Sequence, residues 1–324
     1  MSYKFSSNLK LYIEGLIEQK QAVGYPYDTS SRILKDFDRF CSKHHPTATV
    51  LTAEISMQWA AKRTDEHVNY LVRRITPVRQ LAKYMNSIGV EAYVIPPKIP
   101  QKQIRYVPHI FTQPELHAFF NEIDKPLPSP FSPARHLVVP VFFRLVYCCG
   151  LRPSEARLLY TGDIDMATGR MFIRQSKGHK DRTVMLAEDV LALCRKYETK
   201  VSRIFPDRQA FFPNSKGEFY NRSIPDYWFH LFWDHLGVAG TYSGNSPRVH
   251  DFRHAFSVRR LNLWVNEGRD INAYLPYLSM YLGHVHLTDT DYYIHFASEF
   301  FPTFKRKSTL ACADLIPEAN HAKK

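Results

Sequence analysis

The side chains best suited to catalysis lie in four short segments after residue 149. The segments read GLRPSEARLL from residue 150, SKGHKDR from 176, PRVHDFRHAF from 247 and YLGHVHLTDTDYYIHF from 281. Two arginines suit a phosphodiester, because a guanidinium is always charged and binds two oxygens in a fixed geometry. A lysine can protonate a leaving alkoxide, a histidine can accept a proton, and a tyrosine can be a covalent nucleophile. The segments supply one such set: Arg152, Lys177, His250, Arg253, His284 and Tyr293.

Each segment alone also has an ordinary structural explanation. Arg152 could be a surface arginine at a turn, Lys177 a solvated turn lysine, and His250 a buried histidine with satisfied hydrogen bonds. The Gly-His pair at 283–284 could mark the end of a helix, with the aromatic residues that follow it packed in the core. The combination favours catalysis, since His250 and Arg253 are three apart and would share one face of a helix.

A metal-dependent nuclease is the main chemical alternative. His250 and His254 are four residues apart, and His284 and His286 are close in sequence. HDFRH nevertheless lacks the glutamate of the HExxH zinc motif, and the acidic stretches DIDM and DTD fit turns and helix ends. We therefore expect no metal and no cofactor, with His254 in a structural role.

The elements that must position these side chains are mostly helices. Apolar residues recur at helical spacing through residues 9–85, where Pro77 is expected to kink or split the longest helix. Residues 157–187 change to the short runs RMFIRQS and RTVMLA, joined by KGHKD. These runs predict a β-hairpin, with an edge strand and turn just before it in DIDMATG. The sequence as a whole predicts a mainly α fold with a small antiparallel β-sheet.

Two domains are expected from the length of 324 residues and from a break in composition. The stretch IPPKIPQKQIRYVPH, residues 95–109, has four prolines, three basic residues and no acidic residue, which is typical of an extended linker. We expect a helical domain at residues 1–97, a basic proline-rich linker at 98–107 and a second domain at 108–324.

Charge and composition narrow the class of protein. Lys and Arg number 43 against 31 Asp and Glu, and both expected domains are basic, which favours nucleic acid as partner. A hydrophobic content of 44% argues against a disordered chain. Five cysteines without a CxxC pair argue against a disulfide scaffold and favour a reducing cytoplasm. No apolar run reaches the ~20 residues of a membrane span, and we expect neither a signal peptide nor a membrane partner.

Taken in order, the four segments resemble the sequence blocks of the tyrosine recombinases, also called the phage integrase family of site-specific recombinases. The resemblance covers about residues 110–297, and the basic N-terminal part resembles the family's core-binding domain in position and character. It implies an α+β catalytic domain that follows a helical DNA-gripping domain, the two closing around duplex DNA as a C-shaped clamp.

The resemblance also implies roles for the residues that would handle the phosphate. Arg152 and Arg253 would hold the scissile phosphate, and Lys177 would protonate the leaving 5′ oxygen. His250 would assist proton transfer from the nucleophile. Glu155 would orient neighbouring groups and do no chemistry itself.

The last segment would supply the nucleophile. His284 would hydrogen-bond the phosphate, and Tyr293, nine residues later, would attack it. Clustered positive charge is expected to favour a phenolate-like tyrosine at the attack. Tyr292 is an alternative nucleophile, and Lys180 is an alternative to Lys177 as general acid.

The implied reaction is site-specific recombination of DNA. The tyrosine would form a 3′-phosphotyrosyl bond and free a 5′-hydroxyl, and a 5′-hydroxyl from a partner strand would then reseal the joint. Bond energy is conserved, so neither ATP nor a nuclease-type metal is needed. A catalytically silent DNA-binding relative and a type IB topoisomerase are the alternatives. The silent relative is disfavoured because all six expected chemical positions are filled.

The expected partners follow from the same resemblance. They are duplex DNA, further copies in a homotetramer on two DNA sites, and an accessory or partner recombinase. A phenylalanine-rich tail from about residue 296 would either pack on its own domain or dock on a neighbouring protomer, as the family's C-terminal segments do. From the length of the N-terminal part we expect no extra arm-binding domain of the kind that long phage integrases carry. This favours a Xer-like or transposon-borne enzyme in the cytoplasm, at the nucleoid of a prokaryote or on a mobile element.

Overall fold

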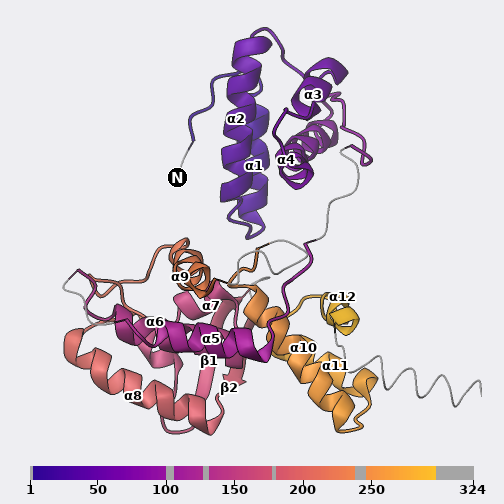
Figure 1. Cartoon of the computed structure of the whole chain (residues 1–324). Helices are drawn as coiled ribbons and strands as arrows, with labels where there is room; N and C mark the ends of the chain where they lie inside the picture. The colour runs from indigo at the N-terminus through magenta and orange to yellow at the C-terminus, as the bar shows by residue number, and fades with distance from the viewer. Residues whose placement is uncertain (1–2, 100–105, 127–130, 177–179, 238–245, 297–324) are drawn as a thin grey trace, which may run out of the picture. The chain divides into compact units, whose positions relative to one another are not determined.

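A computed structural model describes residues 3–99, 106–126, 131–176, 180–237 and 246–296 of the chain (Figure 1). The chain divides into two units, Met1–Tyr106 and Val107–Lys324. The division falls inside the segment that the sequence marks as a linker. Within the described ranges, no helix is both long and apolar enough to cross a bilayer.

The first unit is helical. Its helices are α1 (Lys10–Ala22), α2 (Asp28–His44), α3 (Ala53–Ala60) and α4 (Val68–Ser87). Helix α4 continues through Pro77, so of the two expected effects of this proline, a kink or a split, the split does not occur. Ile75 and Val78 on either side are fully buried, and we attribute the continuity to this burial, which offsets the cost of about 3 kcal/mol for an interior proline.

The second unit contains the expected hairpin. Strands β1 (Arg170–Ser176) and β2 (Lys180–Met185) are antiparallel, with Arg170 opposite Met185 and Ile173 opposite Arg182. The expected edge strand is reduced to one bridge between Ile164 and Met171. The chain turns away after this bridge because the Asp165 carboxylate accepts hydrogen bonds from the backbone of the next turn.

Helices surround this hairpin in the second unit (Figure 1). Phe119, Phe143 and Phe252 lie in a large aromatic core in which α6 (Arg135–Cys148) packs on α8 (Glu188–Ile204) and α10 (Asp251–Asn266). A second apolar cluster joins α10, α11 (Ile271–Leu282) and the segment that carries Tyr293. The helices are α5 (Gln113–Ile123), α6 (Arg135–Cys148), α7 (Pro153–Arg157), α8 (Glu188–Ile204), α9 (Ile224–Trp233), α10 (Asp251–Asn266), α11 (Ile271–Leu282) and α12 (Thr288–Asp291), with short 3-10 turns η1 (Thr161–Asp163), η2 (Asp234–Leu236) and η3 (Tyr292–Phe296). The structure thus confirms a mainly α fold with a small antiparallel sheet.

Candidate active site

The buried carboxylate of Glu155 gathers three arginines from distant parts of the second unit. Glu155 Oε1 accepts hydrogen bonds from Arg152 Nη1 at 2.6 Å and from Arg182 Nη1 at 2.9 Å. Its Oε2 accepts from Arg182 Nη2 at 2.7 Å and lies 3.9 Å from Arg253 Nη1. Burial alone would raise the pKa of Glu155, but the hydrogen bonds and charge of Arg182, with the charge of Arg253, hold it well below its usual value. Three guanidinium groups therefore face one carboxylate, which leaves a net positive charge.

Backbone carbonyls fix the direction of each guanidinium. Arg253 Nη1 donates to the carbonyl of Gly150 at 2.7 Å, and its Nη2 donates to the carbonyl of Leu282. Arg152 Nη2 donates to the carbonyl of Gly283 at 3.1 Å. The end of α11 and the turn before α7 thus hold both arginines in place.

Glycine is required at both of these turns. Gly150 and Gly283 have φ angles of +60° and +65°, which side-chain-bearing residues rarely adopt. A Cβ at position 150 would lie 2.5 Å from the Phe256 ring, and one at 283 would lie 3.1 Å from Arg182 Nη1. The glycines therefore let the chain approach the arginine cluster closely.

Arg182 is the site residue that motif reasoning missed. It lies in β2, and its Nε donates to the carbonyl of Tyr281 at 2.8 Å. Its side chain is nearly buried, on the same strand face as Val184, which is fully buried. The alternation of Arg182 with Val184 and Leu186 was the available sequence signal for an inward-facing arginine.

His250 immediately precedes α10 and lies one turn before Arg253. Burial and the neighbouring His254 and Arg253 lower the pKa of His250 to about 3, so its imidazole is neutral near pH 7. His254 packs with its ring centroid 5.0 Å from that of His250. Burial and the charges of Arg248 and Arg253 lower the pKa of His254 to about 4.

These two histidines should make folding sensitive to mild acid. The unfolded chain takes up their protons near the ordinary histidine pKa of ~6.5 while the folded chain does not. Stability is therefore highest above pH ~6.5 and falls as the pH drops toward the folded values, by up to about 1.4 kcal/mol per pH unit for each histidine. Urea unfolding of His250→Asn and His254→Asn across this range should show a weaker pH dependence than the wild type. His235→Asn, at an exposed position, is the matched control and should keep the wild-type dependence.

Tyr293 lies between α10 and α11 and is almost completely buried. Its ring centroid is 5.3 Å from that of His254 and 6.0 Å from that of His284. Thr290 Oγ1 holds His284 Nδ1 at 2.7 Å, and this threonine is fully buried. The fold thus brings His284 and Tyr293 together, close to Arg253.

Burial raises the pKa of Tyr293, and the charge of Arg253 together with hydrogen bonds to Ser257 and Arg253 only partly offsets this. Without DNA, loss of solvent thus outweighs the positive charge, and the expected phenolate-like character at the attack stays a prediction. Tyr292 is half-buried and packs at the edge of the α10–α11 cluster. Both tyrosines lie in the 3-10 turn η3, where successive side chains point in different directions.

Lys177 lies outside the described residues. The strands that lead to its turn are in place, with Ser176 paired to Lys180 at the turn end of the hairpin. Lys180 starts β2, but its side chain also lies outside the description. The choice between the two lysines as general acid stays a prediction.

In the described part of the chain, the histidines that the sequence offered as metal ligands lack further ligands around them. The rings of His250 and His254 meet edge to face, but the described ranges contain no cluster of three or more His, Cys, Asp or Glu side chains placed to hold an ion.

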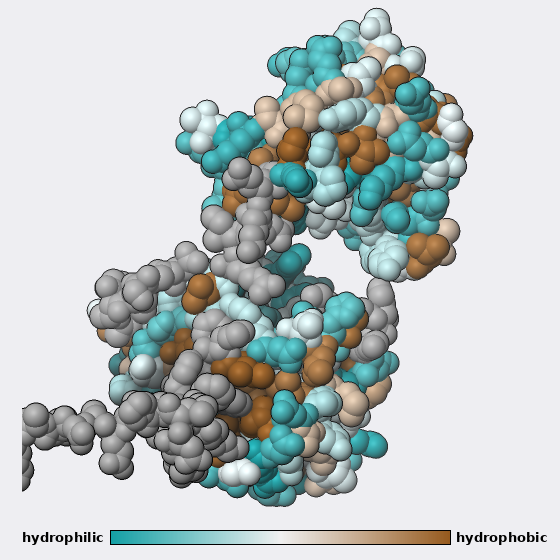
Figure 2. Space-filling model, turned by 90° about the vertical axis from the view of Figure 1, so that its right-hand side faces the viewer, coloured by the Kyte–Doolittle hydropathy of each residue, from teal (hydrophilic) through white to brown (hydrophobic). Residues whose placement is uncertain are grey.

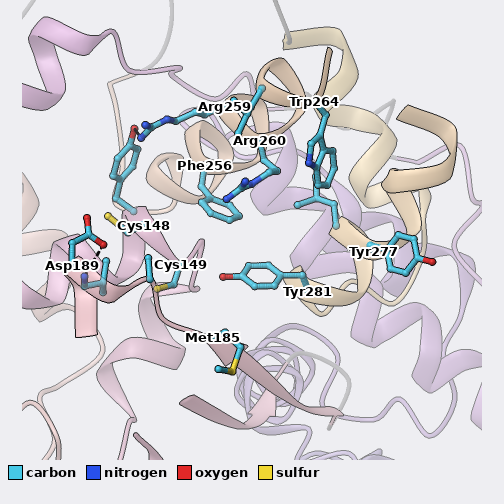
Figure 3. A pocket seen from close by; sticks show the side chains of 15 residues that line it. Cys148, Cys149, Met185, Asp189, Phe256, Arg259, Arg260, Trp264, Tyr277 and Tyr281 are labelled. Carbon is cyan, nitrogen blue, oxygen red and sulfur yellow. Dashed lines mark hydrogen bonds between the residues drawn. The ribbon is translucent and has the colours of Figure 1, made fainter. Parts of the chain in front are cut away.

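A separate apolar cavity lies between the end of α6, the start of α8, and α10 and α11. Its volume is about 480 Å³. The ring of Tyr281 points into it between Phe256, Cys149 and Met185, and Trp264 lies at one side (Figure 3). Figure 2 shows apolar residues gathered on one face of this unit. The exposed apolar side chains of α10, α11 and the turn after α11 are Leu263, Tyr277, Met280, Val285 and Leu287.

Comparison with curated proteins shows relatives along most of the chain. A Sinorhizobium fredii protein provisionally named integrase/recombinase y4rB is 25% identical over 307 residues, which cover 93% of this chain and 97% of the relative. The tyrosine recombinase XerD of Pseudomonas putida is 28% identical over 201 residues, covering 57% of this chain and 63% of that protein.

Solved structures with the same fold include complexes with DNA. A lambda integrase dimer bound to a COC′ core site matches with a TM-score of 0.64 at 14% identity, over 88% of this chain and 94% of that one. The XerH recombinase in a post-cleavage complex with a difH substrate matches with a TM-score of 0.61 at 17% identity, over 87% and 78%. Similarity at this level shows the fold. The profile of the phage integrase family matches residues 111–299, which include all the arginine, histidine and tyrosine positions above. The chain therefore belongs to the phage integrase family, the tyrosine recombinases.

Proposed function

We propose that this protein is a site-specific DNA recombinase that cleaves and rejoins duplex DNA through a 3′-phosphotyrosyl intermediate, for integration, excision or resolution of DNA. One observation carries this proposal. Arg152, Arg253 and Tyr293 come from three separate elements, Arg152 and Arg253 face the same Glu155 carboxylate, and the charge of Arg253 acts on the Tyr293 hydroxyl.

The chemistry then assigns one task to each group. Arg152 and Arg253 bind the non-bridging oxygens of the scissile phosphate and compensate their growing negative charge. The Tyr293 oxygen forms the new bond to phosphorus as the bond to the 5′ oxygen breaks. Neutral His250 assists removal of the tyrosine proton, and Lys177 gives a proton to the leaving 5′ oxygen. His284 hydrogen-bonds the phosphate.

The joining step reverses these transfers. A 5′-hydroxyl from a partner strand loses its proton to Lys177 as it attacks the phosphotyrosyl phosphorus. The tyrosine oxygen leaves, and His250 assists the return of its proton. Because one phosphodiester replaces another, the reaction needs no ATP, and Arg152 and Arg253 supply the charge compensation that a metal supplies in other phosphoryl transfers.

The first unit is proposed to grip the DNA duplex together with the catalytic unit. The exposure of many basic side chains of this unit supports phosphate contacts. These are Lys10, Arg32, Arg39, Lys43, Lys62, Arg63, Arg73 and Lys83. The expected boundaries of 1–97, 98–107 and 108–324 belong to the same proposal.

The active assembly is proposed to be a homotetramer on two DNA sites, with an accessory or partner recombinase as a further component. A lambda integrase tetramer bound to a Holliday junction shares the fold, with a TM-score of 0.63. The tail from about residue 296 would dock on a neighbouring copy, and the apolar cavity beside Trp264 offers a surface for that contact. Light scattering of the protein with two target duplexes tests the stoichiometry. The proposed place of action is the cytoplasm, at the nucleoid or on a mobile element.

A nicked suicide substrate tests the proposed reaction. A nick near the crossover point lets the short 5′-hydroxyl strand diffuse away, so the covalent intermediate accumulates. Wild-type protein should give an adduct that resists SDS and disappears with protease, and EDTA should leave its yield unchanged. A strong loss with EDTA would instead favour metal-assisted cleavage. Tight, specific binding without any adduct would favour the catalytically silent relative.

A further inference from the structure

A second cavity opens beside the candidate active site and has a different character from the apolar one. It has a volume of about 280 Å³ and shares His250 with the site. The charged residues that line it are Arg157, Arg222, Arg248 and Asp226. Three guanidinium groups and one carboxylate therefore surround a space large enough for a phosphate group.

The positive charge of this cavity is only partly compensated. Across the described ranges, no carboxylate lies within salt-bridge distance of Arg157 or Arg222. Arg248 reaches Asp251, with 3.8 Å between Nη2 and Oδ1. His250 adds no charge, because burial keeps its imidazole neutral. An anion entering the cavity would thus meet uncompensated guanidinium charge.

Arg157 is held in place at this cavity. Its Nη1 donates to the backbone carbonyl of Tyr220 at 2.6 Å. Its Nε is buried and has no hydrogen-bond partner in the described part of the chain. Burial, and then the charge of Arg222, lower the pKa of Arg157, which reflects two like charges held close together. Such an arrangement costs stability unless a bound anion relieves it.

We propose that this cavity binds a second backbone phosphate of the DNA strand, adjacent to the phosphate held by Arg152 and Arg253. The inference rests on the proposed function and extends it by one subsite. The position follows from His250, which borders both spaces, so one strand lying across this histidine would present successive phosphates to the two arginine groups. Arg222 and Arg248 are exposed at the rim, and Arg157 is partly buried.

The subsite would fix the register of the strand and would not read its sequence. Phosphate contacts carry no base information, but they set where the duplex lies on the protein. With one phosphate held at Arg157 and Arg222, the next is guided to the nucleophile. We therefore expect these two arginines to act on DNA binding through electrostatics at any sequence.

The salt dependence of binding tests the subsite without knowledge of the target. The full-length protein is titrated with a short mixed-sequence duplex at several salt concentrations, and log K is plotted against log salt. Removal of one arginine–phosphate interaction should make the slope shallower by about 0.9. Arg222→Gln and the double variant Arg157→Gln/Arg222→Gln should each show this change. Arg157→Lys/Arg222→Lys, which keeps the charge, should keep the slope.

Arg203→Gln is the matched control. Arg203 is exposed at the end of α8 and is not among the residues that line the cavity, so its removal should leave the slope as in the wild type. If thermal unfolding shows that the double variant is unstable, Arg222→Gln alone decides the test. Arg222 is exposed, and its loss leaves the hydrogen bond from Arg157 to the Tyr220 carbonyl intact.

The outcomes separate this inference from the proposed function. A steep wild-type slope that Arg222→Gln and the double variant leave unchanged would overturn the subsite alone. A wild-type protein without salt-dependent DNA binding would instead overturn the proposed function. If millimolar inorganic phosphate stabilises the wild type but not Arg222→Gln, and the DNA slope is unaffected, the cavity binds a free anion and the proposal is wrong.

Discussion

Tyr293→Phe should abolish the covalent protein–DNA adduct while leaving DNA affinity nearly unchanged. The substitution removes only the phenolic oxygen, which we propose as the nucleophile, and keeps the ring that packs between His254 and His284. The buried ring keeps its place without the hydroxyl, so a stability loss of no more than about 1 kcal/mol is expected. Adduct yield on the suicide substrate and binding to the same duplex are the two measurements.

The neighbouring tyrosine provides the control for this experiment. Tyr292→Phe removes the same atom one residue earlier, from a side chain at the edge of the α10–α11 cluster. It should form the adduct at close to the wild-type rate. An inactive Tyr292→Phe beside an active Tyr293→Phe would mean that the nucleophile has been assigned to the wrong ring.

Glu155→Gln should be strongly destabilising, because it removes the only carboxylate that pairs with three arginines in the described part of the site. Leaving buried charges without their partner typically costs about 3–5 kcal/mol. We expect a loss in this range in urea unfolding. Surviving folded protein should cleave slowly, since Arg152 and Arg182 would lose the carboxylate that orients them.

The pH dependence separates this effect from that of the histidines. The pKa of Glu155 is lowered by folding, so its contribution is complete above the unfolded value of ~4.3 and is lost only as pH falls through the folded value. The destabilisation by Glu155→Gln should therefore be constant between pH 7 and 5, where the wild type itself weakens through His250 and His254. Glu188→Gln, at the exposed start of α8, should change stability by less than about 0.5 kcal/mol. A loss for Glu155→Gln no larger than this would contradict the central role of the carboxylate.

The sequence identified much of this site because motifs keep their residues at fixed local spacing. His250 and Arg253 are three apart, and the structure places them at the first turn of α10. The helices and the hairpin likewise follow from short-range periodicity. The edge strand was overestimated, because a single aspartate redirects the chain after one bridge.

The parts that could not be predicted depend on contacts between distant segments. Arg182 becomes a site residue only because β2 meets the end of α11, where the Tyr281 carbonyl accepts its Nε–H. The direction of the Tyr293 pKa shift depends on burial among α10, α11 and η3, which no local spacing reveals. The cavity at Arg157 and Arg222 brings together residues 65 positions apart.

The most direct test of the central proposal is to identify the residue that carries the DNA. The adduct trapped on the nicked substrate is digested with nuclease and protease, and the modified peptide is sequenced by mass spectrometry. We expect a nucleotide joined through its 3′ phosphate to the oxygen of Tyr293, with Tyr292 unmodified in the same peptide. Attachment at Tyr292, at a serine or histidine, or through a 5′ phosphate would contradict the proposed mechanism.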